Sequence, residues 1–111
     1  EAYKAADELA KEGISCEIID LRTVRPMDRD AILKSVKKTN RLVVLEEAWP
    51  FGNVSTEITY LVQSEAFDYL DAPIVKINTA DTPAPYSPVL LAEWLPNSDD
   101  VVKAVKKVMY K

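Results

Sequence analysis

The chain is short and mildly acidic. Its 111 residues and 12.4 kDa suit a single domain, and 48% hydrophobic with 29% charged residues is typical of a globular domain rather than a disordered tail. Fourteen basic and eighteen acidic residues give a net charge of −4, which argues against nucleic-acid binding because that needs a basic face. No apolar run approaches the roughly 20 residues of a membrane span. Neither nucleic acid nor a membrane is therefore an expected partner.

The available side chains also limit the chemistry. The chain has no histidine, so it lacks the most common general base near neutral pH and the commonest metal ligand. Its one cysteine, Cys16, cannot form an internal disulfide or a zinc-finger motif. Cys16 also lies in an apolar stretch without a basic neighbour, which favours a core residue over a reactive thiol. The composition argues against a self-sufficient enzyme.

Helices and short strands alternate in the first part of the chain. Alanines and a leucine recur on one face of residues 1–12 and predict an amphipathic helix that ends at Gly13. Residues 14–21 are rich in β-branched side chains and predict a strand. Asp28 is suited to cap the next helix, which Asn40 is suited to end. The first helix has no capping residue before it, which suggests that the chain was cut from a longer one.

The same alternation continues to the end of the chain. Residues 41–46 are almost continuously apolar, which is typical of a strand buried on both faces. Asn53 is suited to cap the helix that follows, and residues 73–78 predict another strand. Four prolines within residues 83–96 predict an ordered loop. Ser98 is predicted to cap the last helix.

This order predicts an α/β fold. Short apolar strands separated by amphipathic helices form a mainly parallel sheet covered by helices on both faces, a three-layer α/β/α sandwich. We expect residues 1–111 to form one domain. Three strands are few for such a sheet, and a further strand ahead of residue 1 would agree with the uncapped start.

Two acidic residues lie where α/β sheets place ligands. Glu46 and Glu47 follow a predicted buried strand at its carboxyl end, and adjacent carboxylates can raise one another's pKa for acid–base chemistry. Neighbours in sequence point in different directions, however, and no partner for a mechanism lies nearby. A structural or interface role is therefore favoured over catalysis.

Other polar and aromatic segments allow two interpretations. Trp49 and Phe51 are either interface anchors or side chains that fold back on a helix. Arg22 and Arg25 could bind an anion, pair across a subunit boundary or form ordinary ion pairs. Residues 81–86 form a rigid proline-containing loop, which favours a contact surface over a reaction centre.

Four motifs carry a family resemblance. They are Ile19-Asp20-Leu21-Arg22-Thr23-Val24-Arg25-Pro26-Met27-Asp28, Val43-Val44-Leu45-Glu46-Glu47-Ala48-Trp49-Pro50, Phe67-Asp68-Tyr69-Leu70-Asp71-Ala72-Pro73 and Asp81-Thr82-Pro83-Ala84-Pro85-Tyr86. In this order and spacing, essentially from end to end, the chain resembles the transketolase-type C-terminal domain of pyruvate dehydrogenase beta subunits. These belong to the thiamine-diphosphate-dependent 2-oxo acid dehydrogenases.

The resemblance implies a role in a larger enzyme. In that family the domain opens with a strand before the first helix, and the intact alpha–beta heterotetramer decarboxylates pyruvate on thiamine diphosphate and magnesium. The acetyl group then passes to the lipoyl group of dihydrolipoyl acetyltransferase. The cofactor and catalytic residues of the beta subunit lie in its N-terminal half, so the resemblance implies that this fragment alone binds no cofactor and is inactive. The implied compartment is the bacterial cytoplasm or the mitochondrial matrix.

The resemblance also implies two partner-binding residues. In relatives, this domain helps pair the beta subunits and binds the peripheral-subunit-binding domain of the acetyltransferase. The aspartate of the Leu-Asp-Ala-Pro motif and the end of the chain contact basic residues there, and the matching positions are Asp71 and Lys111. Lys111 departs from the apolar end of some relatives, and Asp71 could instead be a plain turn residue.

Two alternatives stay open from the sequence. The chain could belong to the beta subunit of a branched-chain 2-oxo acid or acetoin dehydrogenase, because the substrate pocket of these enzymes lies elsewhere. It could also be a free-standing α/β module with its own small ligand.

Overall fold

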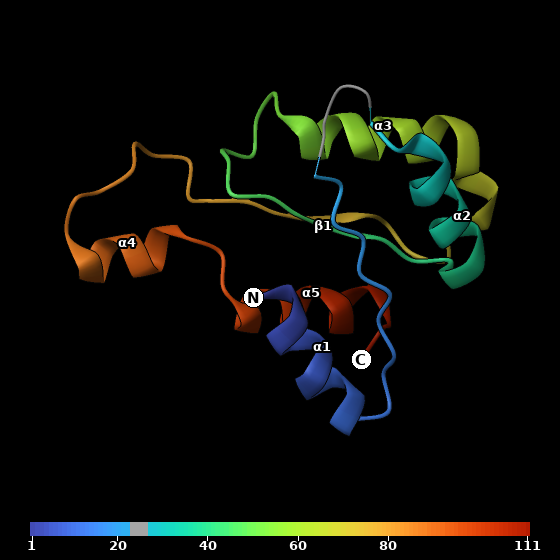
Figure 1. Ribbon diagram of the computed structural model, residues 1–111, viewed down its shortest axis with the longest axis horizontal. Helices are drawn as coiled ribbons and strands as arrows, with labels where there is room; N and C mark the ends of the chain where they lie inside the picture. Colours follow the sequence, from blue (N-terminus) through green and yellow to red (C-terminus); the bar gives the residue numbers. More distant parts are fainter. Residues whose placement is uncertain (23–26) are drawn as a thin grey trace.

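The computed structural model describes residues 1–22 and 27–111. The elements in chain order are α1 (Ala2–Lys11), α2 (Arg29–Thr39), β1 (Val43–Leu45), α3 (Val54–Ala66), the 3₁₀ turn η1 (Phe67–Tyr69), β2 (Val75–Ile77), α4 (Pro88–Trp94) and α5 (Ser98–Val108). Figure 1 shows α2 and α3 on one side of the strands and α1 with α5 on the other. The predicted three-layer α/β/α arrangement is confirmed.

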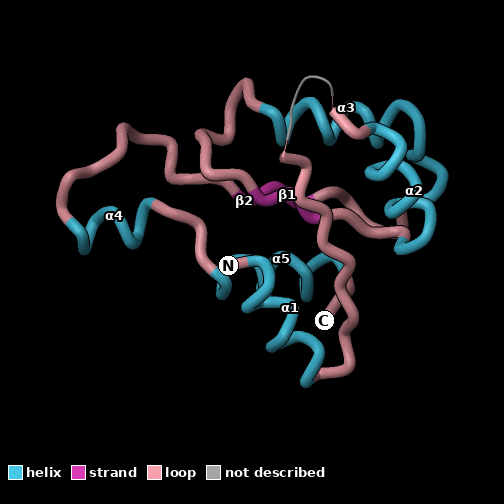
Figure 2. The backbone as a smooth tube through the Cα atoms, in the orientation of Figure 1, coloured by secondary structure: helices cyan, strands magenta, loops and turns pink. Residues whose placement is uncertain are grey.

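The sheet is parallel and small. Within the described residues it has two strands, β1 and β2, with Val43 opposite Val75 and Leu45 opposite Ile77. They lie at the centre of the molecule (Figure 2). Both are shorter than the predicted strands at 41–46 and 73–78, although the Glu46 amide still donates to the Ile77 carbonyl and the Val75 amide to the Leu42 carbonyl. A parallel pair needs a crossover, and α3 supplies it.

Each face of the sheet has its own core. Val44 points to one face, where it packs with Ile32, Val36 and Val62 of α2 and α3. Val43, Leu45 and Ile77 belong to the other face, against α1 and α5. This alternation follows from the two-residue period of a strand. The nearly continuous apolar run at 41–46 is thus explained by burial on both sides.

Several helix ends form as the sequence predicts. The Asp28 carboxylate accepts a hydrogen bond from the Ala31 amide, and the Asn53 side chain does the same for the Thr56 amide. Gly13 and Asn40 have φ values of +80° and +65° and end α1 and α2 in the left-handed region.

The predicted strand at 14–21 is wrong in this structure. Those residues form neither a strand nor a helix (Figure 2). Ile14 is buried but Ile19 is 39% exposed. The segment is extended, as its β-branched composition favours, but no strand of the described residues pairs with it. A strand ahead of residue 1 stays a prediction.

Two details of the last part also differ from expectation. The cap of α5 is Asn97, not Ser98, because Asn97 and Asp100 form a reciprocal capping box. The proline-rich stretch 83–96 contains the short helix α4, with Pro88 in its first turn. Backbone amides in a first turn have no partner within the helix, so the amide hydrogen that proline lacks is not needed there.

Candidate functional site

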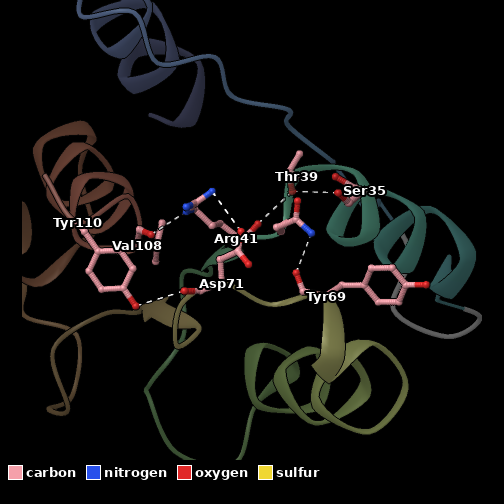
Figure 3. Close-up of polar contacts among 8 residues, drawn as sticks. Ser35, Thr39, Arg41, Tyr69, Asp71, Val108 and Tyr110 are labelled. Carbon is pink, nitrogen blue, oxygen red and sulfur yellow. Dashed lines mark hydrogen bonds and ion pairs between the residues drawn. The ribbon is translucent and has the colours of Figure 1, made fainter.

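Asp71 lies in a turn between η1 and β2 that is fixed to the end of α2. Its amide donates a hydrogen bond to the Asn40 carbonyl at 2.8 Å. The Asn40 side chain in turn donates to the Tyr69 carbonyl at 2.8 Å (Figure 3). The left-handed residue that ends α2 therefore also holds the turn that carries Asp71.

The Asp71 carboxylate faces Arg41 at the surface. The Arg41 Nη1 lies 3.8 Å from Asp71 Oδ2, and the side chains are 30% and 57% exposed, respectively. Arg41 Nε donates to the Val108 carbonyl at 3.0 Å, at the end of α5 (Figure 3). At 3.8 Å the ion pair is longer than a hydrogen bond, and the Asp71 carboxylate accepts none from the described residues. It keeps its hydrogen-bonding capacity for another donor.

The C-terminal residues reach the same surface. The Tyr110 hydroxyl donates to the Asp71 carbonyl at 3.3 Å. The next residue, Lys111, is exposed, and its amide donates to the Lys106 carbonyl at 2.9 Å. Lys111 thus directly follows the residue whose side chain contacts the turn of Asp71. We call Asp71, Arg41, Tyr110 and Lys111 the Asp71 surface.

Sequence reasoning missed Arg41 and Tyr110. Arg41 bonds a residue 67 positions away, and Tyr110 one 39 positions away. No local pattern signals such contacts, because they depend on how α2, the turn and α5 pack.

Glu46 has a local structural partner. Its carboxylate accepts a hydrogen bond from the Ser55 amide at 3.3 Å, in the first turn of α3, where a carboxylate stabilises the helix dipole. The buried Ser55 hydroxyl accepts one from the Asn78 side chain at 3.2 Å. Glu47 is exposed. The predicted position past the end of a buried strand is confirmed, and the contacts of Glu46 are those of a structural residue.

The described residues do not fit a magnesium–diphosphate site. Nowhere in residues 1–22 and 27–111 do three or more His, Cys, Asp or Glu side chains gather as metal ligands. At the carboxyl end of β1, the Glu46 carboxylate is engaged by the Ser55 amide of α3 and Glu47 is exposed. No helix in these parts of the chain is long and apolar enough to cross a membrane.

A largely apolar groove of about 710 Å³ lies between residues 14–22, β1 and α1. Cys16 lines it, and burial raises the pKa of its thiol. The Ser35 hydroxyl donates to the Glu17 carboxylate at 2.6 Å and, with a smaller contribution from Lys38, holds the pKa of that carboxyl below its usual range. The segment is thus attached to α2 through Glu17.

The remaining predicted residues lie outside the Asp71 surface. Arg22 is exposed, with Nε 4.0 Å from its neighbour Asp20, and Arg25 lies outside the described residues. Trp49 and Phe51 are 52% and 90% exposed, so they do not fold back into a core.

The side chains of Trp49 and Trp94 both bind the start of the proline loop. Both indole N–H groups donate to the Thr82 carbonyl, each at 2.8 Å. Beyond this point α4 stands away from the body of the molecule (Figure 1). None of the seven α4 residues is buried, and Tyr86, Val89 and Leu90 are largely exposed. We call residues 82–95 the α4 arm.

Comparison with known families identifies the domain. Residues 1–101 match the family described as "Transketolase, C-terminal domain". The chain belongs to this family. The solved structure of a split-gene transketolase, an inactive beta4 tetramer, matches this transketolase C-terminal domain with a TM-score of 0.82 and 28% identity, over 98% of this chain and 34% of that one.

Curated relatives are more similar in sequence. The pyruvate dehydrogenase E1 component subunit beta of Rhizobium meliloti is 56% identical over 99% of this chain and 24% of its own length. The protein of the same name from Rickettsia felis is 51% identical over 98% and 33%. The mitochondrial subunit beta-2 of Oryza sativa is 49% identical over 99% and 29%. This transketolase C-terminal domain spans a quarter to a third of these relatives.

Proposed function

We propose that the chain is the C-terminal domain of a pyruvate dehydrogenase E1 beta subunit. The names of relatives about 50% identical over nearly the whole chain support pyruvate over a branched-chain 2-oxo acid or acetoin. The intact enzyme would use thiamine diphosphate and magnesium, held outside this chain. Bacterial and mitochondrial relatives support the bacterial cytoplasm or the mitochondrial matrix as its compartment.

The domain itself serves docking and assembly. The observation that carries the docking role is Asp71. Its amide and carbonyl are both hydrogen-bonded, yet its side chain is 57% exposed and its carboxylate accepts no hydrogen bond from the described residues. Such a carboxylate suits a basic partner, here the peripheral-subunit-binding domain of dihydrolipoyl acetyltransferase. Lys111 lies at the edge of the same surface and is a second proposed contact.

The α4 arm supports the assembly role. Only one of its fourteen residues, Glu93, is charged, whereas 29% of the chain is. Low charge and exposed apolar side chains are features of subunit interfaces. We therefore assign the arm to contact with the alpha subunit or the second beta subunit.

The docking role is tested by removing one charge. Asp71→Asn in the assembled dehydrogenase should weaken binding of the acetyltransferase's binding domain by about 1–3 kcal/mol, because a charge-assisted hydrogen bond is lost. Asp68→Asn, at an exposed position of η1, makes the same charge change and should have little effect. Calorimetric titration at moderate salt measures both affinities. Equal affinities for the two variants would remove Asp71 from the docking site.

A further inference from the structure

We propose that Arg41 is a competitor, supplied by the chain itself, for the Asp71 carboxylate, and that it lowers the affinity of the docking site for a basic partner. This inference rests on the proposed docking function. It adds a residue that sets the strength of the site and gives the sign of its effect. Removing the Arg41 charge should tighten docking, whereas removing the Asp71 charge should weaken it.

The Arg41 side chain is anchored beside Asp71. Its Nε donates to the Val108 carbonyl at 3.0 Å, at the end of α5 (Figure 3). The last carbonyls of a helix have no partner within it and carry partial negative charge, so they favour a cation. The Arg41 side chain is 30% exposed, the lowest value for a cation among the ion pairs of the described chain. A partner that displaced Arg41 from Asp71 would also disturb its bond to α5.

Arg41 reduces the negative potential of Asp71 without using its hydrogen-bonding capacity. The Arg41 Nη1 lies 3.8 Å from Asp71 Oδ2, which is beyond hydrogen-bond distance. In another exposed pair, by contrast, the Arg29 Nη2 reaches Glu65 Oε2 at 2.6 Å. The Asp71 carboxylate can therefore still accept a hydrogen bond from a partner, although the positive charge of Arg41 weakens its attraction for a second cation.

Two cations that share one carboxylate repel one another. A basic group of the partner that donates to the Asp71 carboxylate would lie within a few ångströms of the Arg41 guanidinium. Like charges at that separation repel even at a protein surface, and salt screens the repulsion because both side chains are partly exposed. We therefore expect Arg41 to keep docking weaker than the Asp71 carboxylate alone would make it.

The experiment measures binding of the acetyltransferase's binding domain to the assembled dehydrogenase by calorimetric titration, at physiological and at high salt. Arg41→Gln removes the charge and should tighten binding about two- to fivefold at physiological salt, the range of an exposed charge pair. The gain should shrink at high salt. Arg41→Lys keeps a positive charge and should bind nearly as the unmodified enzyme does. A purely structural role of Arg41 would instead make both variants bind more weakly.

Arg29→Gln is the matched control. It removes the same charge from the other end of α2, an 11-residue helix that is about 16 Å long. Physiological salt largely screens exposed charges at that distance, so Arg29→Gln should leave the affinity unchanged. Equal gains for Arg29→Gln and Arg41→Gln would show an effect of net charge and would overturn the local role of Arg41.

A double substitution separates the failure of this inference from the failure of the docking function. In the Asp71→Asn enzyme, Arg41→Gln should give a smaller gain, because the partner's basic group is no longer held beside Arg41. Equal gains with and without the Asp71 carboxylate, or unchanged or weaker binding by Arg41→Gln, would overturn the role of Arg41. Normal binding by Asp71→Asn alone would show instead that the docking function itself fails.

Discussion

Cys16 and Glu17 are neighbours in the extended segment after α1, yet their surroundings shift their pKa values for different reasons. Successive side chains of an extended chain point in opposite directions. Cys16 lines the apolar groove, and burial raises the pKa of its thiol. Glu17 meets Ser35 of α2, whose hydrogen bond lowers the pKa of the carboxyl. The environment of each residue comes from packing that the local sequence does not contain.

Slow alkylation of Cys16 is the expected consequence at this scale. A raised pKa leaves less thiolate at pH 8, and the thiolate is the reacting species. In the folded chain, iodoacetamide should modify Cys16 more slowly than in the chain unfolded by urea. Mass spectrometry over time measures both rates, with a free cysteine-containing peptide as the reference. Equal rates in the folded and unfolded chains would contradict the burial of this thiol.

At the scale of elements, α5 shows how a cap is chosen between two adequate residues. Asn97 and Ser98 are both good N-cap residues. Asn97 takes the position because Asp100 lies three residues later and its carboxylate accepts a hydrogen bond from the Asn97 amide. Ser98 becomes the first helical residue, and its amide donates to the Glu1 carboxylate at 2.7 Å. The spacing of the capping box was in the sequence and could have identified Asn97.

Substitution at the two positions should separate them. Asn97→Ala removes the side-chain oxygen that accepts from the Asp100 amide and should lower the free energy of unfolding by about 1 kcal/mol. Ser98→Ala leaves the amide contact with Glu1 in place and should change it by less than about 0.5 kcal/mol. Urea denaturation of the 111-residue chain measures both. A larger loss for Ser98→Ala than for Asn97→Ala would indicate that Ser98 is the cap.

The whole molecule consists of a packed body and the α4 arm. The body holds two cores on opposite faces of the sheet. The arm contributes no buried residue from α4 and is joined to the body through hydrogen bonds from the Trp49 indole to the Thr82 carbonyl and from the Ala80 amide to the Trp94 carbonyl. A surface change on α4 should therefore affect assembly without affecting folding.

Val89→Asp in a full-length beta subunit tests this separation. Val89 is 71% exposed, and an acidic residue in the first turn of α4 is compatible with the helix dipole. We expect assembly of the alpha–beta heterotetramer to be lost in size-exclusion chromatography, while the circular dichroism spectrum of the beta subunit is unchanged. Gln63→Asp adds the same charge at an exposed position of α3 and should assemble. Normal assembly of Val89→Asp would show that the arm is not an interface.

The sequence by itself determined the layered α/β fold, the positions of the two paired strands and most helix ends. These follow from short-range physics: apolar periodicity sets which face of a helix is buried, and Asp28, Asn40 and Asn53 satisfy backbone groups within three or four residues. The family resemblance added Asp71 and Lys111 as candidate partner-binding residues.

Tertiary structure alone decided the rest. Residues 14–21 have the composition of a strand, but a strand exists only where a neighbour supplies hydrogen bonds, and no local pattern reports that. Arg41 and Tyr110 joined Asp71 because the end of α2, the turn before β2 and the end of α5 meet at one place. These contacts join residues that are 39 and 67 positions apart in the sequence. They depend on the packing of whole elements, and the sequence pattern around each residue does not predict them.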